Sequence, residues 1–136
     1  MDCVFCKIAA GDIPCHRLYE DDRALAFLDI MPVSRGHLLV IPREHVEFAY
    51  DADPELMGHV MRVATRIARA AQSALQCQGM NFILNCGAIA GQVVPHAHMH
   101  LVPRYPDDGI RWPWPQGTLA GDDAARLRAA ILENLA

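Results

Sequence analysis

The clearest periodic pattern in the chain lies between residues 54 and 76, where apolar residues recur at three- and four-residue steps. This spacing places them on one continuous face of a helix. Asp53 is a favourable N-cap, and Pro54 suits the first helical position because no hydrogen-bond donor is lost there. Gly79 is expected to stop the helix. The apolar positions that predict it are Leu56, Met57, Val60, Met61, Ala64, Ile67, Ala68, Ala71 and Leu75.

Short apolar runs between turn-forming residues predict strands elsewhere. The first two flank a turn at residues 20–22 and form a hairpin, and the last two are separated by a glycine-containing loop at residues 87–91. A short N-terminal helix over residues 4–10 is expected to end at Gly11. A series of strands with one long helix inserted predicts the α+β class, with an antiparallel sheet of about five strands. The predicted strands are 15–20, 23–29, 37–41, 81–85 and 97–102.

A chain of 136 residues is the length of one domain, so residues 1–136 are expected to form a single unit. Its core spans about residues 3–105. Residues 106–136 form a C-terminal extension, in which the Trp- and Pro-rich segment 112–115 cannot be regular structure. Asp122 is expected to cap a last short helix that carries Leu127, Ile131 and Leu135.

Composition narrows the possible partners. The chain is 52% apolar and 21% charged, which is typical of a globular protein, and its net charge is -4. This acidic balance argues against sequence-independent binding of nucleic acid, although a few local donors can still hold one phosphorylated ligand. The N-terminus has no signal-peptide pattern, and the apolar runs are far shorter than the roughly 20 residues of a membrane span. We therefore expect a cytoplasmic protein without a membrane partner.

Three histidines, His96, His98 and His100, alternate with apolar residues. In a strand, side chains two residues apart share a face, so the three imidazoles are expected to line up while the intervening residues enter the core. The pattern fits a metal site, since imidazole is a good zinc ligand. It also fits nucleophilic and acid–base catalysis at phosphorus, because the pKa of imidazole lies near neutrality.

Further motifs occur in order around this cluster. They are Phe5 and Ile8, then Asp29-Ile30-x-Pro32 eight residues before His37, then the run 38–42, Asn85 and Gly91-Gln92. Together with residues 91–102, the chain resembles the histidine-triad (HIT) superfamily, in its Hint-like branch, over roughly residues 3–105.

The resemblance implies a reaction and a set of roles. His98 would attack the α-phosphorus of a purine nucleotide or dinucleotide and form a covalent nucleotidyl-histidine, which water would then hydrolyse. His100 would contact the phosphate and leaving group, and His37 would support the nucleophile. Asp29 would accept hydrogen bonds from the ribose. Phe5, Ile8 and Ile30 would wall the base, and Asn85, Gln92, Val93 and Val94 would hold the phosphate or leaving group.

The resemblance also implies a homodimer with joined sheets, in which residues 112–115 lie near the partner's active site. One position departs from the family pattern. Many Hint-type phosphoramidases have Ser where this chain has Val93, whose side chain cannot help to protonate an amine. Arg104, after the triad, also looks more like the relatives that cleave dinucleoside polyphosphates.

Cys3 and Cys6 form a Cys-x-x-Cys pair, which by itself indicates metal binding, redox chemistry or coincidence. Some bacterial members of the resembled family hold structural zinc with such a pair and two histidines. The matching residues here are Cys3, Cys6, His45 and His96, four S and N ligands that would close a tetrahedral site. The other three cysteines are expected to be apolar fillers.

Two other functions stay open from the sequence. The chain could be a nucleotide-binding regulatory module with weak or vestigial hydrolase activity. It could also be a zinc hydrolase in which His96, His98 and His100 all bind the metal. No acidic ligand or general base stands within the motif, which argues against the zinc hydrolase.

Overall fold

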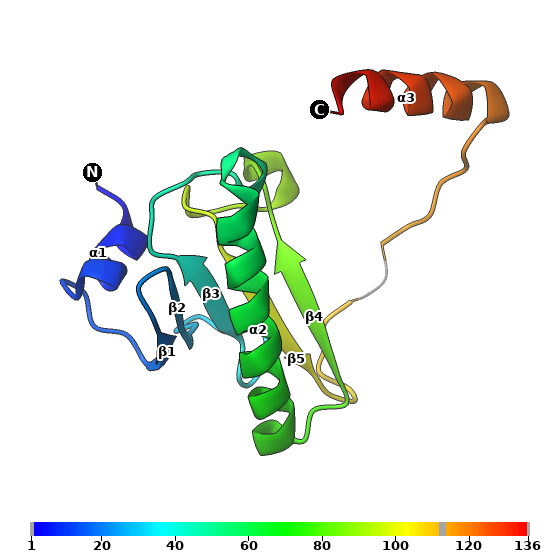
Figure 1. Cartoon of the computed structure of the whole chain (residues 1–136). Coiled ribbons are helices and arrows are strands. Elements are labelled where there is room, and N and C mark those ends of the chain that lie inside the picture. Colours follow the sequence, from blue (N-terminus) through cyan, green and yellow to red (C-terminus); the bar gives the residue numbers. More distant parts are fainter. Residues whose placement is uncertain (1, 112–113, 136) are drawn as a thin grey trace.

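A computed structural model describes residues 2–111 and 114–135 (Figure 1). The helices are α1 (Val4–Ala10), α2 (Pro54–Leu75) and α3 (Gly121–Asn134), with short 3-10 helices η1 (Ala49–Asp51) and η2 (Ala88–Ala90). The strands are β1 (Arg17–Glu20), β2 (Ala24–Leu28), β3 (Leu38–Pro42), β4 (Gly79–Leu84) and β5 (Met99–Arg104). No helix in the described part of the chain is long and apolar enough to cross a membrane.

The strands form one antiparallel sheet in the order β1-β2-β3-β5-β4, which confirms the α+β class and the five-stranded sheet. Strand β5 inserts between β3 and β4, so that Leu39 of β3 lies opposite His100 of β5. Strand β4 forms one outer edge. This order brings the segment before β3 beside the histidine motif, 63 residues further along the chain.

Helix α2 covers one face of the sheet (Figure 1). Its apolar side packs on alternate residues of β2, β3 and β5, which include Ala24, Ala26, Val40 and Leu101. Asp53 caps the helix by accepting a hydrogen bond from the Glu55 amide at 3.0 Å, as the sequence predicts.

Helix α1 covers part of the opposite face. Phe5 and Ile8 pack on Leu25, Phe27, Leu39 and Ile41, which alternate with the residues under α2. Strands β2 and β3 are therefore buried on both faces, which explains their nearly continuous apolar sequences. His100 shares the α1 face of the sheet, because it lies opposite Leu39.

Several element boundaries differ from the prediction. Strand β5 begins at Met99 rather than residue 97, so His96 and His98 precede it. Helix α2 ends when Gln76 adopts a left-handed conformation, and Gly79 opens β4 instead of stopping the helix. Asp122 lies in the first turn of α3, and Ala120 is the N-cap. Residues 112 and 113 of the expected Trp/Pro segment lie outside the described residues.

Candidate active site and metal centre

The candidate active site lies on the α1 face of the sheet, where His37, His98 and His100 meet. His37 immediately precedes β3, His98 immediately precedes β5, and His100 belongs to β5. The rings of His98 and His100 have centroids 4.7 Å apart, and those of His37 and His100 are 5.2 Å apart. The sheet therefore brings together three imidazoles from two segments that are distant in the sequence.

Hydrogen bonds assign the protons of two of these rings. The Val33 amide donates to Nδ1 of His37 at 3.1 Å, so Nδ1 is an acceptor and the proton of neutral His37 sits on Nε2. This Nε2 lies 2.9 Å from Nδ1 of His100 and donates to it. The proton of His100 is consequently on Nε2, where it remains available to donate to a ligand.

The ring of His98 has the arrangement that a nucleophile needs. Its Nδ1 lies 2.7 Å from the main-chain oxygen of His96, which can only accept, so Nδ1 carries the proton. The lone pair is then on Nε2. The Phe5 ring packs edge-on against His98 with centroids 5.0 Å apart and restricts how the imidazole can turn.

Burial keeps these imidazoles neutral at pH 7. It lowers the pKa of His37 and of His98, and the nearby Asp29 carboxylate opposes this effect only in part. Burial and the two neighbouring imidazoles lower the pKa of His100 to about 4. A neutral ring can donate a hydrogen bond or attack through its lone pair, but it carries no positive charge.

Asp29 lies at the edge of the histidine cluster, partly exposed. One carboxylate oxygen accepts from the Met31 amide at 2.8 Å, and the other lies 3.6 Å from Nε2 of His37. Atoms of Asp29, His37 and His100 are close enough to one another to hold a metal ion. However, the proton on Nε2 of His37 occupies the position that a metal would need, so the hydrogen bonds oppose this use.

The loop before the histidine motif is held by Gln92. Its side-chain oxygen accepts from the Gly87 amide, and its side-chain nitrogen donates to the carbonyls of Glu47 and Val94. The side-chain amide of Gln92 thus has both its N–H groups engaged within the protein, and it positions the loop. Gly91 has a φ of +101°, and an added Cβ would lie 3.3 Å from the Asn85 side chain. Asn85, which is expected to hold the phosphate or leaving group, therefore lies against this loop.

The expected base-binding residues differ in exposure. Phe5 and Ile8 belong to α1 and are buried against the sheet, whereas Ile30 is 80% exposed on the loop after β2. Val93 is 89% exposed, and Val94 is half-buried. Phe5 and Ile8 therefore belong to the core as much as to a pocket wall, and Ile30 and Val93 are open to a ligand.

A second cluster lies beside the first and contains the four residues expected to bind zinc. Nδ1 of His96 is 3.5 Å from the Cys3 sulfur and 3.6 Å from the Cys6 sulfur, and Nδ1 of His45 is 3.3 Å from the Cys6 sulfur. A tetrahedral zinc with bonds of about 2.0–2.3 Å separates its S and N ligands by about 3.5 Å. The three distances match this separation, and all four ligand atoms lie within 4.8 Å of one another.

The surroundings of the cluster favour metal binding as well. Nε2 of His96 donates to the Pro42 carbonyl at 2.8 Å, which leaves the Nδ1 lone pair directed at the two sulfurs. Burial and the neighbouring Cys3 thiol raise the pKa of Cys6, and a bound cation would offset both effects. All five cysteines are free of disulfides.

The expectation that three consecutive imidazoles line one strand face is wrong for His96. The Ala97 amide donates to the Val46 carbonyl at 2.7 Å, and the backbone turns at His96, before β5 begins. His96 consequently faces the cysteines, while His98 faces His100. The described residues contain no cluster that joins all three rings, so the zinc-hydrolase arrangement is not formed.

The structure adds main-chain groups that sequence reasoning missed. The Val33 amide, the His96 carbonyl and the Pro42 carbonyl decide which nitrogen of each imidazole carries the proton. No residue type signals these roles, because every residue except proline offers the same backbone groups. The short distance in sequence between His37 and the loop that contains Pro32 is the one feature that hints at the contact between His37 and the Val33 amide.

Comparisons with known proteins point to one family. The HIT domain family model matches residues 10–107. An Arabidopsis thaliana protein named adenylylsulfatase HINT3 is 42% identical over 76% of this chain and 52% of its own. A Schizosaccharomyces pombe protein named adenosine 5'-monophosphoramidase hnt1 is 39% identical over 83% of this chain and 84% of its own.

Solved structures match over nearly the whole chain. The crystal structure of a HIT family member from Bacillus subtilis has a TM-score of 0.94 and 41% identity, over 100% of this chain and 99% of that one. A zinc-bound histidine triad family protein from Mycobacterium smegmatis has a TM-score of 0.76 and 41% identity, over 98% and 95% of the two chains.

Proposed function

Because the chain belongs to the HIT domain family, we propose that it cleaves a purine nucleotide derivative at the α-phosphorus, with Nε2 of His98 as the nucleophile. The observation that carries the proposal is the hydrogen bond from Nδ1 of His98 to the His96 carbonyl. It holds the ring in the tautomer whose lone pair is on Nε2, and the same carbonyl stabilises the positive charge that develops on the ring after attack.

The reaction proceeds in two steps. In the first, the Nε2 lone pair of His98 forms a bond to the α-phosphorus, and the bond from phosphorus to the leaving group breaks with its electron pair on the leaving group. In the second, water attacks the same phosphorus. The nitrogen–phosphorus bond then breaks, the electron pair returns to Nε2, and the proton from water leaves with the nucleoside monophosphate or to solvent.

His100 stabilises charge in this scheme. Its Nε2–H is free to donate to an oxygen on phosphorus, while His37 holds its other nitrogen. Because the pKa of His100 is about 4, the ring donates a hydrogen bond at pH 7 and not a full proton. The side chain of Val93 cannot give a proton to the leaving group either. We therefore expect the chain to prefer leaving groups that depart as anions, such as phosphates, over amines.

The remaining contacts follow the expected roles. Phe5, Ile8 and Ile30 would contact the base, and Asp29 would accept from the ribose hydroxyls. The names of the Arabidopsis thaliana and Schizosaccharomyces pombe relatives differ in the leaving group but share the adenylyl unit, which supports purine specificity. Asn85 and the backbone of residues 93–94 would hold the phosphate, on a loop positioned by Gln92.

We also propose that Cys3, Cys6, His45 and His96 bind one structural zinc ion. The support is the fit of the four ligand atoms, which lie within 4.8 Å of one another, and the zinc-bound relative. All four positions of a tetrahedral ion would be filled by protein, so the ion would leave no site for substrate. It would fix α1 against the turn that carries His98.

Two copies of the chain would join through strand β4 in a homodimer. This strand is an outer edge of the sheet, and its backbone groups face outwards next to the exposed side chain of Phe82. Edge strands are normally shielded or paired, because their free N–H and C=O groups template association. Pairing of two β4 strands would satisfy them and extend the sheet.

The test is rapid-quench analysis of radiolabelled diadenosine polyphosphate and of adenosine phosphoramidate. The wild type should form an acid-labile protein–AMP adduct, and His98→Gln should form none and lose at least about 10³-fold in kcat. His16→Gln, on the surface, should behave as wild type. Unchanged turnover in His98→Gln would refute the covalent mechanism. Nucleotide binding without turnover by the wild type would instead identify a binding module.

Metal analysis tests the zinc site separately. The wild type should hold one zinc per chain, and Cys3→Ser with Cys6→Ser should lose it. The double change Cys15→Ser and Cys86→Ser removes two thiols outside the cluster and should retain the ion. Retention of one zinc per chain by the Cys3/Cys6 variant would place the metal elsewhere.

A further inference from the structure

A tight turn over residues 34–37 brings His37 to the active site. The His37 amide donates to the Ser34 carbonyl at 3.1 Å, and Gly36 has a φ of +89°, a conformation that favours glycine. An added Cβ at Gly36 would collide with the Leu75 side chain and lie 3.4 Å from the ring of Pro103. The turn is therefore packed closely between the end of α2 and the end of β5.

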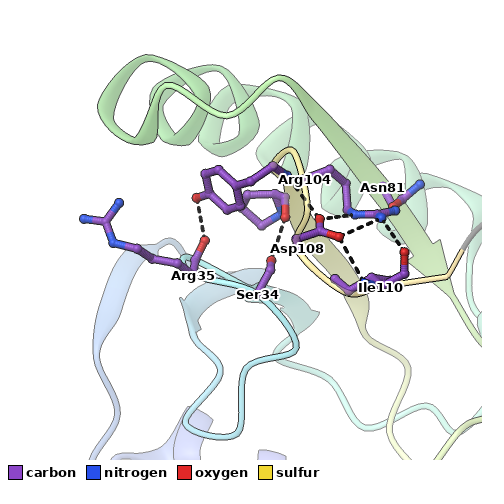
Figure 2. Close-up of polar contacts among 8 residues, drawn as sticks. Ser34, Arg35, Asn81, Arg104, Asp108 and Ile110 are labelled. Atoms are coloured by element: carbon purple, nitrogen blue, oxygen red, sulfur yellow. Dashed lines mark hydrogen bonds and ion pairs between the residues drawn. The ribbon is translucent and has the colours of Figure 1, made fainter.

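Two side-chain hydroxyls join this turn to the end of β5 (Figure 2). The Ser34 hydroxyl donates to the Pro103 carbonyl at 2.6 Å, and the Tyr105 hydroxyl donates to the Arg35 carbonyl at 2.7 Å. The partners are 69 and 70 residues apart in the sequence. We call these four residues, Ser34, Arg35, Pro103 and Tyr105, the clasp.

A second group of hydrogen bonds fixes the backbone on the β5 side of the clasp. Figure 2 shows Asp108 accepting two hydrogen bonds from the Arg104 guanidinium, at 2.7 and 3.1 Å. Asp108 also accepts from the Tyr105 amide at 3.1 Å, and Arg104 donates to the side chain of Asn81 and to the Ile110 carbonyl, both at 3.0 Å. Tyr105 therefore offers its hydroxyl from a defined position.

The loop of residues 30–33, which precedes the turn, is not held by the apolar core. All four of its side chains are exposed, and Ile30, Met31 and Val33 are exposed by 80%, 82% and 58%. Its position consequently depends on hydrogen bonds at its two ends. Asp29 holds the first end through the Met31 amide, and the clasp holds the second.

The Val33 amide lies in this loop and sets the proton order of two imidazoles. It donates to Nδ1 of His37, so Nε2 of His37 donates to Nδ1 of His100, and Nε2 of His100 keeps a proton. Without the Val33 amide, the order can reverse, with Nδ1 of His100 donating to Nε2 of His37. Nε2 of His100 would then present a lone pair, which repels phosphate oxygens.

We propose that Ser34 and Tyr105 are positioning residues of the active site, whose bonds in the clasp hold the Val33 amide on His37 and so keep the proton of His100 on Nε2. The inference rests on the proposed function, in which this Nε2–H donates to an oxygen on phosphorus. Both hydroxyls bond main-chain carbonyls, so they act on the histidines through the backbone. Ser34 directly follows Val33 and begins the turn that ends at His37.

The test compares two matched double variants of the full-length protein. Ser34→Ala with Tyr105→Phe, the clasp variant, removes both clasp hydroxyls. Ser73→Ala with Tyr50→Phe, the control variant, removes the same atoms from exposed positions of α2 and η1. Single changes of Ser34 to Ala and to Thr then separate the hydroxyl from the rest of the side chain.

NMR of protein labelled with ¹⁵N-histidine shows which ring nitrogen carries each proton. In the wild type, the protons of His37 and His100 are expected on Nε2, and that of His98 on Nδ1. In the clasp variant, the Nδ1 and Nε2 signals of His37 and His100 should shift towards each other as the reversed order becomes populated. His98 should not shift, because the His96 carbonyl holds its proton.

Three NMR results would overturn the proposal. The first is equal signals of His37 and His100 in the clasp and control variants. The second is a shift of His98 as large as that of His37, which would indicate a general loosening of the site. The third is the same shift in Ser34→Ala and Ser34→Thr, because the threonine hydroxyl should keep the wild-type order.

Turnover of diadenosine polyphosphate gives a second readout. The clasp variant should lose at least about fivefold in kcat, the effect of one neutral hydrogen bond, with a smaller change in KM. The control variant should retain the wild-type kcat. A loss confined to KM would overturn the positioning role. A wild type without turnover would refute the proposed function alone, since the NMR comparison needs no reaction and still decides whether the clasp sets the proton order.

Discussion

The depressed pKa of His100 makes a quantitative prediction about acid stability. The folded protein resists protonation of this ring, whose pKa is about 4, whereas the ordinary value is 6.5. The unfolded chain therefore binds a proton more readily, and stability falls as the pH drops from 6.5 towards 4. Substitution of His100 by Gln removes this contribution but keeps an amide that can accept from His37.

The size of the effect follows from the pKa difference. One pKa unit corresponds to about 1.4 kcal/mol, so the full difference is worth about 3 kcal/mol, most of which has developed by pH 4.5. His100 is only partly buried, and water near the ring reduces the penalty. We expect the wild type to lose about 2 kcal/mol more than His100→Gln between pH 7 and pH 4.5.

Urea unfolding followed by circular dichroism at the two pH values measures this difference. Both proteins are stripped of metal first, so that acid release of zinc does not contribute. His16→Gln removes a surface imidazole and controls for the number of histidines, and it should retain the wild-type loss. If wild type and His100→Gln lose the same stability on acidification, burial does not lower the pKa of His100 as described.

Three further outcomes are expected. Asp53→Ala should lower the free energy of unfolding by about 1 kcal/mol in urea titrations because α2 loses its cap, and Asp53→Asn should restore most of it. Gly91→Ala should reduce kcat/KM as the new methyl group meets Asn85, whereas Gly109→Ala, with open space around it, should leave kcat/KM unchanged. Asp108→Asn should speed amide exchange at residues 105–110, and unchanged exchange there would show that the carboxylate does not hold this segment.

Local sequence patterns were sufficient for most of the secondary structure. The predicted helix over residues 4–10 matches α1, and the long helix is confirmed from Pro54 to Leu75. A helix is determined by its cap, by proline at its first position and by the spacing of its apolar residues. These features act between residues that are close in sequence, so the local sequence is enough to predict the helix. The predicted strand over residues 97–102 begins two residues before β5, because the amide of Ala97 bonds to the Val46 carbonyl, far away in the chain.

Sequence patterns were enough to predict the class of the fold, the family and the kinds of side chain that meet in the site. The histidine spacing left a metal site and a catalytic site open, and only the family resemblance assigned His96 to zinc and His98 and His100 to catalysis. His96 joins Cys3, 93 residues earlier, while His100 joins His37, 63 residues earlier. Only tertiary structure brings these partners together, and only then do backbone carbonyls and amides place each proton. The reactivity of an imidazole depends on that placement, which is a property of distant neighbours and not of local sequence.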